Sequence, residues 1–282
     1  MKLRTVKAQH PALRDDIADL VTRRPLPGPA VAQIDPFLFL NHHGPQIYPP
    51  YNHGLPFGPH PHRGFETVTF ILEGSLSHSD SGGHESIIHA GGVQWMTAGR
   101  GLVHAELSPA EFKRTGGPLE ILQLWVNLPA SLKMTAPRYV GLQRDQIRHL
   151  ALDEGRVNVA LIAGSWGWER GPIDTLYDQT MSTVEFQPGG RLVVEVPAER
   201  NIFLYVVRGD LVIDGFAAQP HHLIEFANDG DGIELTTASG AVMLFGHAKP
   251  IGEPVVSHGP FVMNTREEIM AAIRDYQAGK FG

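Results

Sequence analysis

Residues 59–80 of the chain read PHPHRGFETVTFILEGSLSHSD. In this stretch the run from Thr67 to Leu72 is followed by Glu73-Gly74, a pattern typical of a short β-strand that ends in a turn. Similar runs bounded by turn residues recur along the chain, at residues 86–89, 119–128, 191–196, 202–207, 222–226 and 242–245. Short strands at regular spacing predict an all-β fold, either a sandwich or a barrel.

The two halves of the chain also resemble each other. TVTFILEGSLSHSD (67–80) is similar to NIFLYVVRGDLVIDG (201–215), and GGVQWMTAGRG (91–101) is similar to DGIELTTASG (231–240). Two copies of one antiparallel β-fold explain this most simply, because 282 residues suffice for two domains of ordinary size. We place the join near Pro129 to Gly141, and expect one domain over residues 1–135 and another over residues 136–282.

Two pairs of potential metal ligands lie in the first half, His60-Pro61-His62 and His104-Ala105-Glu106. Alternate side chains of a strand point to the same face, so each pair can converge on one site. A single histidine is more often a surface or hydrogen-bonded core residue. Three imidazoles with one carboxylate, however, suit a mononuclear transition metal such as iron, copper, nickel or manganese.

The second half lacks these ligands. With an offset of 135 residues, Glu195 and Pro197 take the positions of His60 and His62, and residues 239–243 stand opposite His104 and Glu106. We therefore expect one metal per chain, bound in the first half.

Composition limits the remaining possibilities. The net charge of -7 and the lack of any lysine-arginine run argue against direct nucleic-acid binding. The absence of cysteine excludes disulfides and thiolate ligands, so a metal must be held by nitrogen and oxygen. Neither an apolar leader nor a run of about 18 apolar residues is present, which predicts a cytoplasmic protein without membrane contact.

One short helix is expected at the end of the chain. Thr265-Arg266-Glu267-Glu268 fits a capping box, in which the Thr265 hydroxyl and the Glu268 carboxylate each satisfy a free backbone N–H. Ile269, Ile273 and Tyr276 would then line one face, and Gly279 would end the helix. We interpret it as a structural brace.

Longer motifs indicate a family. Gly54-x5-His60-x-His62-x3-Glu66 fits the first cupin motif, and Gly99-x-Gly101-x2-His104 fits the end of the second. With VQWMTAGRGLVHAE (93–106) and EPVVSHGPFVMNT (253–265), the chain resembles the pirin family from about Asp35 to its C-terminal helix. The resemblance implies a bicupin of two antiparallel jelly-roll β-barrels, the second followed by the short helix, with one divalent metal in the N-terminal barrel.

The resemblance also implies which residues hold that metal. The ligands of the family correspond to His60, His62, His104 and Glu106, and the metal is usually iron(II), with copper, nickel, manganese or cobalt as alternatives. A general cupin would use Glu66 as the carboxylate, and its spacing from His62 permits this. The pirin pattern favours Glu106 and leaves Glu66 a supporting or structural role.

The resemblance to the pirin family implies two possible functions, which belong to different classes. The first is a quercetin 2,3-dioxygenase, which cleaves a flavonol with O2 and releases carbon monoxide. Four protein ligands leave two octahedral positions for the substrate oxygen and for water or dioxygen, and Glu106 would accept the substrate proton. The alternative is a non-enzymatic, iron-dependent and redox-sensitive regulator that acts through protein partners. A purely structural metal is a third possibility, which the open positions argue against.

Overall fold

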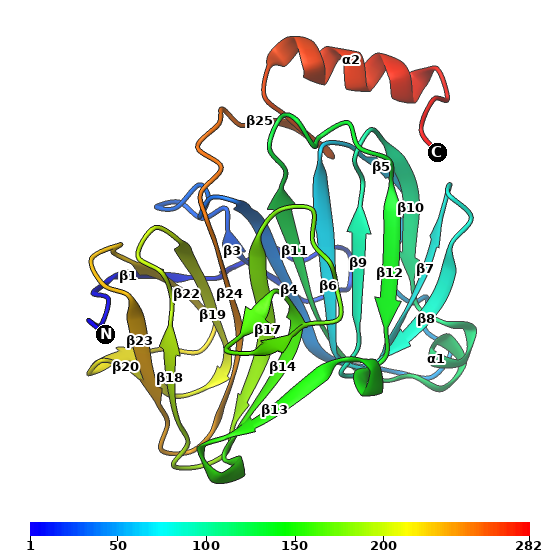
Figure 1. The fold of residues 1–282 in the computed structure, drawn as a ribbon. Coiled ribbons are helices and arrows are strands. Elements are labelled where there is room, and N and C mark those ends of the chain that lie inside the picture. Colours follow the sequence, from blue (N-terminus) through cyan, green and yellow to red (C-terminus); the bar gives the residue numbers. More distant parts are fainter. The chain divides into compact units, whose positions relative to one another are not determined.

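The computed structural model describes residues 1–282, and most of them form antiparallel strands, as the sequence predicts (Figure 1). Close contacts divide the chain into two units. We name them after the half of the chain that supplies most of each. The first-half unit comprises Arg14–Arg24, Leu38–Arg144 and Ile251–Gly282, and the second-half unit comprises Met1–Leu13, Pro25–Phe37 and Asp145–Pro250.

The strands that lie wholly or partly in the first-half unit and build its two main sheets are β2 (Leu13–Arg14), β3 (Thr22–Leu26), β4 (Phe37–Tyr48), β5 (Phe57–His62), β6 (Phe65–Glu73), β7 (Ser75–Asp80), β8 (Glu85–His89), β9 (Val93–Thr97), β10 (Leu102–Leu107), β11 (Gly117–Asn127) and β12 (Arg138–Leu142). They form a seven-stranded sheet with the order β12-β9-β6-β11-β4-β3-β2 and a four-stranded sheet with the order β5-β10-β7-β8. Strand β6 lies near the middle of the larger sheet, and every residue from Phe65 to Ile71 is buried. Both faces of the strand are therefore covered, although the run contains three polar residues, Glu66, Thr67 and Thr69.

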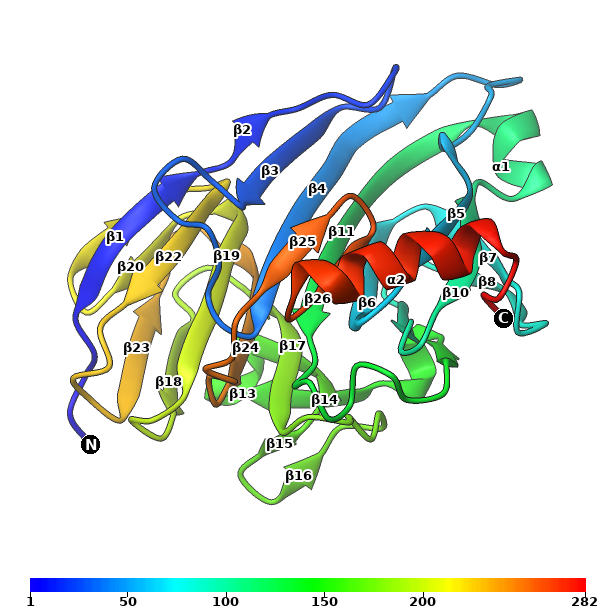
Figure 2. The same ribbon diagram turned by 90° about the horizontal axis from the view of Figure 1, so that it is seen from above.

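Two helices accompany these strands. Helix α1 (Ala110–Thr115) has six residues and no side-chain cap, and the sequence did not predict it, because so short an element carries no periodic pattern. Helix α2 (Arg266–Gln277) follows the hairpin of β25 (Val256–His258) and β26 (Phe261–Met263). Its predicted capping box between Thr265 and Glu268 is confirmed. Figure 2 shows α2 passing over β26 and β6.

The strands of the second-half unit are β1 (Val6–Pro11), β13 (Arg148–Leu152), β14 (Val157–Ala163), β15 (Ser165–Trp166), β16 (Glu169–Arg170), β17 (Gln179–Phe186), β18 (Arg191–Glu195), β19 (Asn201–Gly209), β20 (Leu211–Ile213), β21 (Phe216–Ala218), β22 (His222–Phe226), β23 (Gly232–Thr236) and β24 (Ala241–Ala248). One sheet has the order β1-β22-β19-β24-β17-β14-β13, another has the order β18-β23-β20-β21, and β15 pairs with β16 alone. Between the two larger sheets lies a core that includes Val159, Leu204, Ile224 and Phe245. Two 3-10 turns, Arg144–Gln146 and Asp153–Gly155, flank β13.

The sheet orders support the internal repeat and correct one part of it. The order β9-β6-β11 has its counterpart in β22-β19-β24, and β5-β10-β7-β8 has its counterpart in β18-β23-β20-β21. Residues 67–80 and 201–215 therefore do correspond. The pairing of residues 91–101 with residues 231–240 is wrong, because β23 corresponds to β10 and not to β9.

The incorrect alignment arose because β9 and β23 each follow a turn that contains glycine. As a consequence, the counterparts of His104 and Glu106 lie in β23 and not in residues 239–243. The strands that match β5 and β10 read RLVVE (β18) and GIELT (β23), and neither contains a histidine.

The units of close contact are discontinuous in sequence. Residues 1–13 belong to the unit of the second half, and residues 251–282, with α2, belong to the unit of the first half. That one β-barrel is formed mainly by residues 1–135 and the other mainly by residues 136–282 stays a prediction. Neither helix of the fold has the length and apolarity needed to cross a membrane.

Candidate metal centre

Three of the four proposed ligands are gathered by one pair of strands. In the antiparallel pair of β5 and β10, His104 stands directly opposite His60, and Leu102 stands opposite His62. The candidate ligand atoms of His60, His62 and His104 all lie within 4.8 Å of one another. The i,i+2 spacing places His60 and His62 on the same side of β5, as strand geometry requires.

Backbone carbonyls orient two of these rings. Nδ1 of His60 donates to the carbonyl oxygen of Gly58 at 2.8 Å, and Nδ1 of His62 donates to that of Pro260 at 3.3 Å. A carbonyl can only accept, so Nδ1 carries a proton, and in a neutral ring Nε2 then keeps a lone pair. Metal-binding histidines commonly have such a partner on the non-ligating nitrogen.

The arrangement of the nitrogens fits a metal ion. Nε2 of His104 lies 2.9 Å from Nε2 of His60. Two ligands at right angles, each about 2.1 Å from a metal, would be separated by a similar distance. Burial lowers the pKa of His62 to about 3 and that of His104 well below its usual value, so both stay neutral, the form that coordinates a metal.

Glu106 lies next to this group, two residues after His104, and its carboxylate is held by the larger sheet. Oε1 accepts from Oγ1 of Thr69 at 2.8 Å, and Oε2 accepts from Nε2 of Gln123. Thr69 and Gln123 stand opposite each other on β6 and β11. Burial raises the pKa of Glu106, because its negative charge is poorly solvated there. A bound cation would supply the missing compensation, so the donor set fits a metal.

Glu66 lies on the other face of β6. Side chains alternate along this strand, so Thr69, which contacts Glu106, and Glu66, three residues earlier, point in opposite directions. Oε1 of Glu66 accepts from Oγ1 of Thr97 at 2.6 Å, and Oε2 is buried without a hydrogen-bond partner. Burial raises the pKa of Glu66 as well. The geometry therefore favours Glu106 over Glu66 as a ligand.

The structure places further side chains beside these ligands that the sequence pattern did not indicate. His78 on β7 stands opposite Glu106, its ring centre is 5.4 Å from that of His104, and it stacks on Tyr139 at 3.9 Å. Nε2 of His78 is 2.9 Å from Oδ2 of Asp80, which is buried. The even spacing of His78 and Asp80 within the strand was the available signal.

An aromatic wall stands beside His62. The ring of Trp125 on β11 is 5.4 Å from that of His62, 4.6 Å from that of Phe39 and 4.5 Å from that of Phe65. Trp125 and Phe39 are only partly buried. The metal centre thus has a planar apolar surface on one side.

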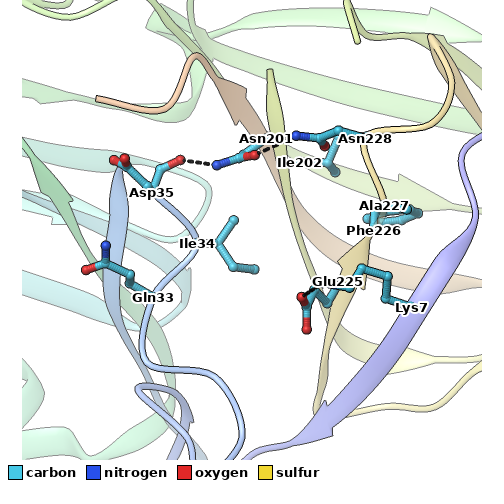
Figure 3. A pocket seen from close by; sticks show the side chains of 10 residues that line it. All are labelled: Lys7, Gln33, Ile34, Asp35, Asn201, Ile202, Glu225, Phe226, Ala227 and Asn228. Atoms are coloured by element: carbon cyan, nitrogen blue, oxygen red, sulfur yellow. Dashed lines mark hydrogen bonds and ion pairs between the residues drawn. The ribbon is translucent and has the colours of Figure 1, made fainter. Parts of the chain in front are cut away.

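A separate cavity lies in the second-half unit, with a volume of about 420 Å³ (Figure 3). Several of its polar side chains bond to one another or to the backbone. Lys7 pairs with Glu225, Asn228 donates to Asn201, and Asn201 donates to the carbonyl oxygen of Asp35. The cavity lacks the grouped imidazoles that mark the metal centre.

Comparisons with known proteins agree with this geometry. The Pirin family model matches residues 19–126, and the model of the Pirin C-terminal cupin domain matches residues 181–282. Human Pirin is 37% identical over 271 residues, which cover 92% of this chain and 87% of that protein.

Solved structures are also similar. A quercetin 2,3-dioxygenase from Acinetobacter baumannii has a TM-score of 0.94 and 32% identity, with 100% of this chain and 99% of that chain covered. The Escherichia coli pirin YhhW, solved with nickel(II), has a TM-score of 0.67 and 22% identity over 86% of this chain and 99% of its own. The predicted all-β bicupin fold is confirmed, and the chain belongs to the pirin family.

Proposed function

We propose that this pirin-family protein is a metal-dependent quercetin 2,3-dioxygenase, which uses O2 to open the central ring of a flavonol and releases carbon monoxide. The observation that carries the proposal is the convergence of His60, His62 and His104 beside the buried Glu106. The similarity of fold and sequence to the quercetin 2,3-dioxygenase of Acinetobacter baumannii supports it.

His60, His62, His104 and Glu106 would hold one divalent metal, for which we propose iron(II). Such a metal, when bound, supplies Lewis-acid and redox chemistry to the site. A nickel(II) complex is known for the related Escherichia coli pirin, and the same nitrogen and oxygen donors suit nickel, copper, manganese or cobalt.

Residues of the chain would accept the substrate proton and bind the flavonol rings. Glu106 would accept the proton of the flavonol 3-hydroxyl, because it is the carboxylate two residues after His104, beside the histidines that would hold the metal. Thr69 and Gln123 hold its two oxygens in place. Trp125 and Phe39 would pack against the planar rings of the substrate and exclude water from one side.

The 3-hydroxyl group provides the test. With quercetin under air, the metal-loaded protein is expected to consume one O2 and release one carbon monoxide per flavonol. A flavone without the 3-hydroxyl should not react, because it has no oxygen at the 3-position that can bind the metal as an anion. Oxygen uptake, the loss of the flavonol absorption band and carbon monoxide release measure the reaction.

Protein whose metal content is verified, and which consumes no oxygen with any flavonol, would contradict the dioxygenase. The iron-dependent regulator that acts through protein partners would then be the better account of the same metal centre.

A further inference from the structure

The C-terminal segment contacts the chain at the residues that follow the metal-ligating pair of β5. Val262 N donates to the carbonyl oxygen of Arg63 at 3.0 Å, and Arg63 forms a parallel bridge with Phe261. The carbonyl of Pro260 accepts from the His62 ring. His62 is therefore enclosed by β10 on one side and by residues 260–262 on the other. Pro260 follows His62 by 198 residues in the sequence.

A buried lysine fastens this contact. Nζ of Lys133 donates to the carbonyl oxygens of Gly64 at 2.8 Å and of Val262 at 3.1 Å, and to Oδ1 of Asn127. A Cβ on Gly64 would lie 2.0 Å from the oxygen of Val262, so the two backbones approach as closely as glycine allows. Burial lowers the pKa of Lys133 to about 8, which leaves it mostly protonated at neutral pH.

Arg63 connects the C-terminal segment to the second ligand strand. Its Nε donates to the carbonyl oxygen of Arg100 at 2.5 Å, in the turn that leads from β9 into β10 and His104. One terminal nitrogen donates to Oδ2 of Asp275 on α2 at 2.9 Å. The guanidinium carbon lies 4.6 Å from the centre of the Phe281 ring, and that ring packs against Gly101 in the same turn.

The side chain of Arg63, the residue after His62, thus contacts both the turn that leads to His104 and helix α2. The side chain of Arg63 is only 5% exposed, so its charge depends on the partners that surround it. Asp275 supplies the opposite charge, and without it the buried cation loses its strongest partner. Helix α2 itself is also held by Ile269 and Ala272, which pack with Phe261, so Asp275 is not needed merely to keep the helix in place.

We propose that Arg63 and Asp275 are positioning residues of the metal centre, and that the C-terminal helix acts as a clasp that sets the relative placement of His62 and His104. This inference rests on the proposed metal centre. Its consequence is that a residue on α2, which coordinates nothing, controls the affinity and the coordination geometry of the metal.

The test compares Asp275→Asn with Glu267→Gln. Both exchanges convert an acid into its amide on α2, but Glu267 is exposed in the first turn, whereas Asp275 contacts Arg63. Co²⁺ is the probe, and its dissociation constant is measured by competition with a chelator. We expect Asp275→Asn to weaken Co²⁺ binding about tenfold, the range known for residues that orient ligands, while Glu267→Gln binds as the wild type does.

The visible absorption spectrum of bound Co²⁺ gives a second readout, which a loss of stability alone would not move. Asp275→Asn should change this spectrum in fully loaded, folded protein. In a double-mutant cycle, adding Asp275→Asn to Arg63→Met should cause no further loss of affinity, because the contact is already gone. If Arg63→Met does not fold, the Co²⁺ affinity and spectrum of Asp275→Asn alone test the proposal.

The outcomes separate the clasp from the metal centre. If the wild type binds Co²⁺ and Asp275→Asn shows the same affinity and spectrum, the clasp is wrong and the metal centre stands. An equal loss in Glu267→Gln would also overturn the clasp, since it would reflect charge alone. If the wild type itself binds no Co²⁺, both proposals fall.

Discussion

The double variant His60→Ala with His104→Ala is expected to purify without metal and to remain folded. These two rings face each other across β5 and β10 with their Nε2 atoms 2.9 Å apart, so the exchange removes both facing donors at once. The fold should persist, because the buried β-core and not the ion supplies most of the stability of a domain of this size. Elemental analysis and thermal unfolding measure the two effects.

Two exposed histidines provide the matched control. His53 and His89 lie in the same half of the chain, outside the ligand group, and both are exposed. The double variant His53→Ala with His89→Ala should keep one metal per chain. Metal retained after the loss of His60 and His104, or two metals per chain in the wild type, would show that the assignment of the site is wrong.

Exchange of the two buried glutamates should have opposite consequences. Glu106→Gln is expected to weaken metal binding on the order of tenfold or more and to abolish flavonol cleavage, because it removes a charged ligand and the proposed base. Glu66→Gln should leave metal content and activity near those of the wild type. Its carboxyl faces away from the histidines, and a glutamine amide oxygen can still accept from Thr97.

The comparison is informative because the two positions are matched. Both carboxyls are buried in the same unit, and burial raises both pKa values, so general destabilisation should be similar. Chelator competition and oxygen uptake are measured on both variants. If Glu66→Gln loses the metal and Glu106→Gln keeps it, the ligand is Glu66, as in the general cupin pattern.

Local patterns predicted much of the fold. The Thr265 capping box formed as expected, and the apolar runs became strands, since both depend on residues close in sequence. Helix α1 was missed because six residues carry too little pattern. Residues 91–101 were aligned with residues 231–240, one strand too far along the second half, because similar glycine turns precede β9 and β23.

The metal centre shows the same limit. Alternation along a strand predicted that His60 and His62 would face the same way, and their candidate ligand atoms do lie close to one another and to that of His104. Alternation could not decide between Glu66 and Glu106, because that choice depends on how β6 packs against β10. The contacts of Pro260 with His62 and of Asp275 with Arg63 could not be predicted from local patterns either. They join parts of the chain that are about 200 residues apart in the sequence.

An anomalous-scattering crystal structure of the metal-loaded protein would examine this account of the site in one step. We expect a single anomalous peak per chain, within coordination distance of the Nε2 atoms of His60, His62 and His104 and of one carboxylate oxygen of Glu106. A peak at any other place, or a metal coordinated by Glu66 in place of Glu106, would contradict it.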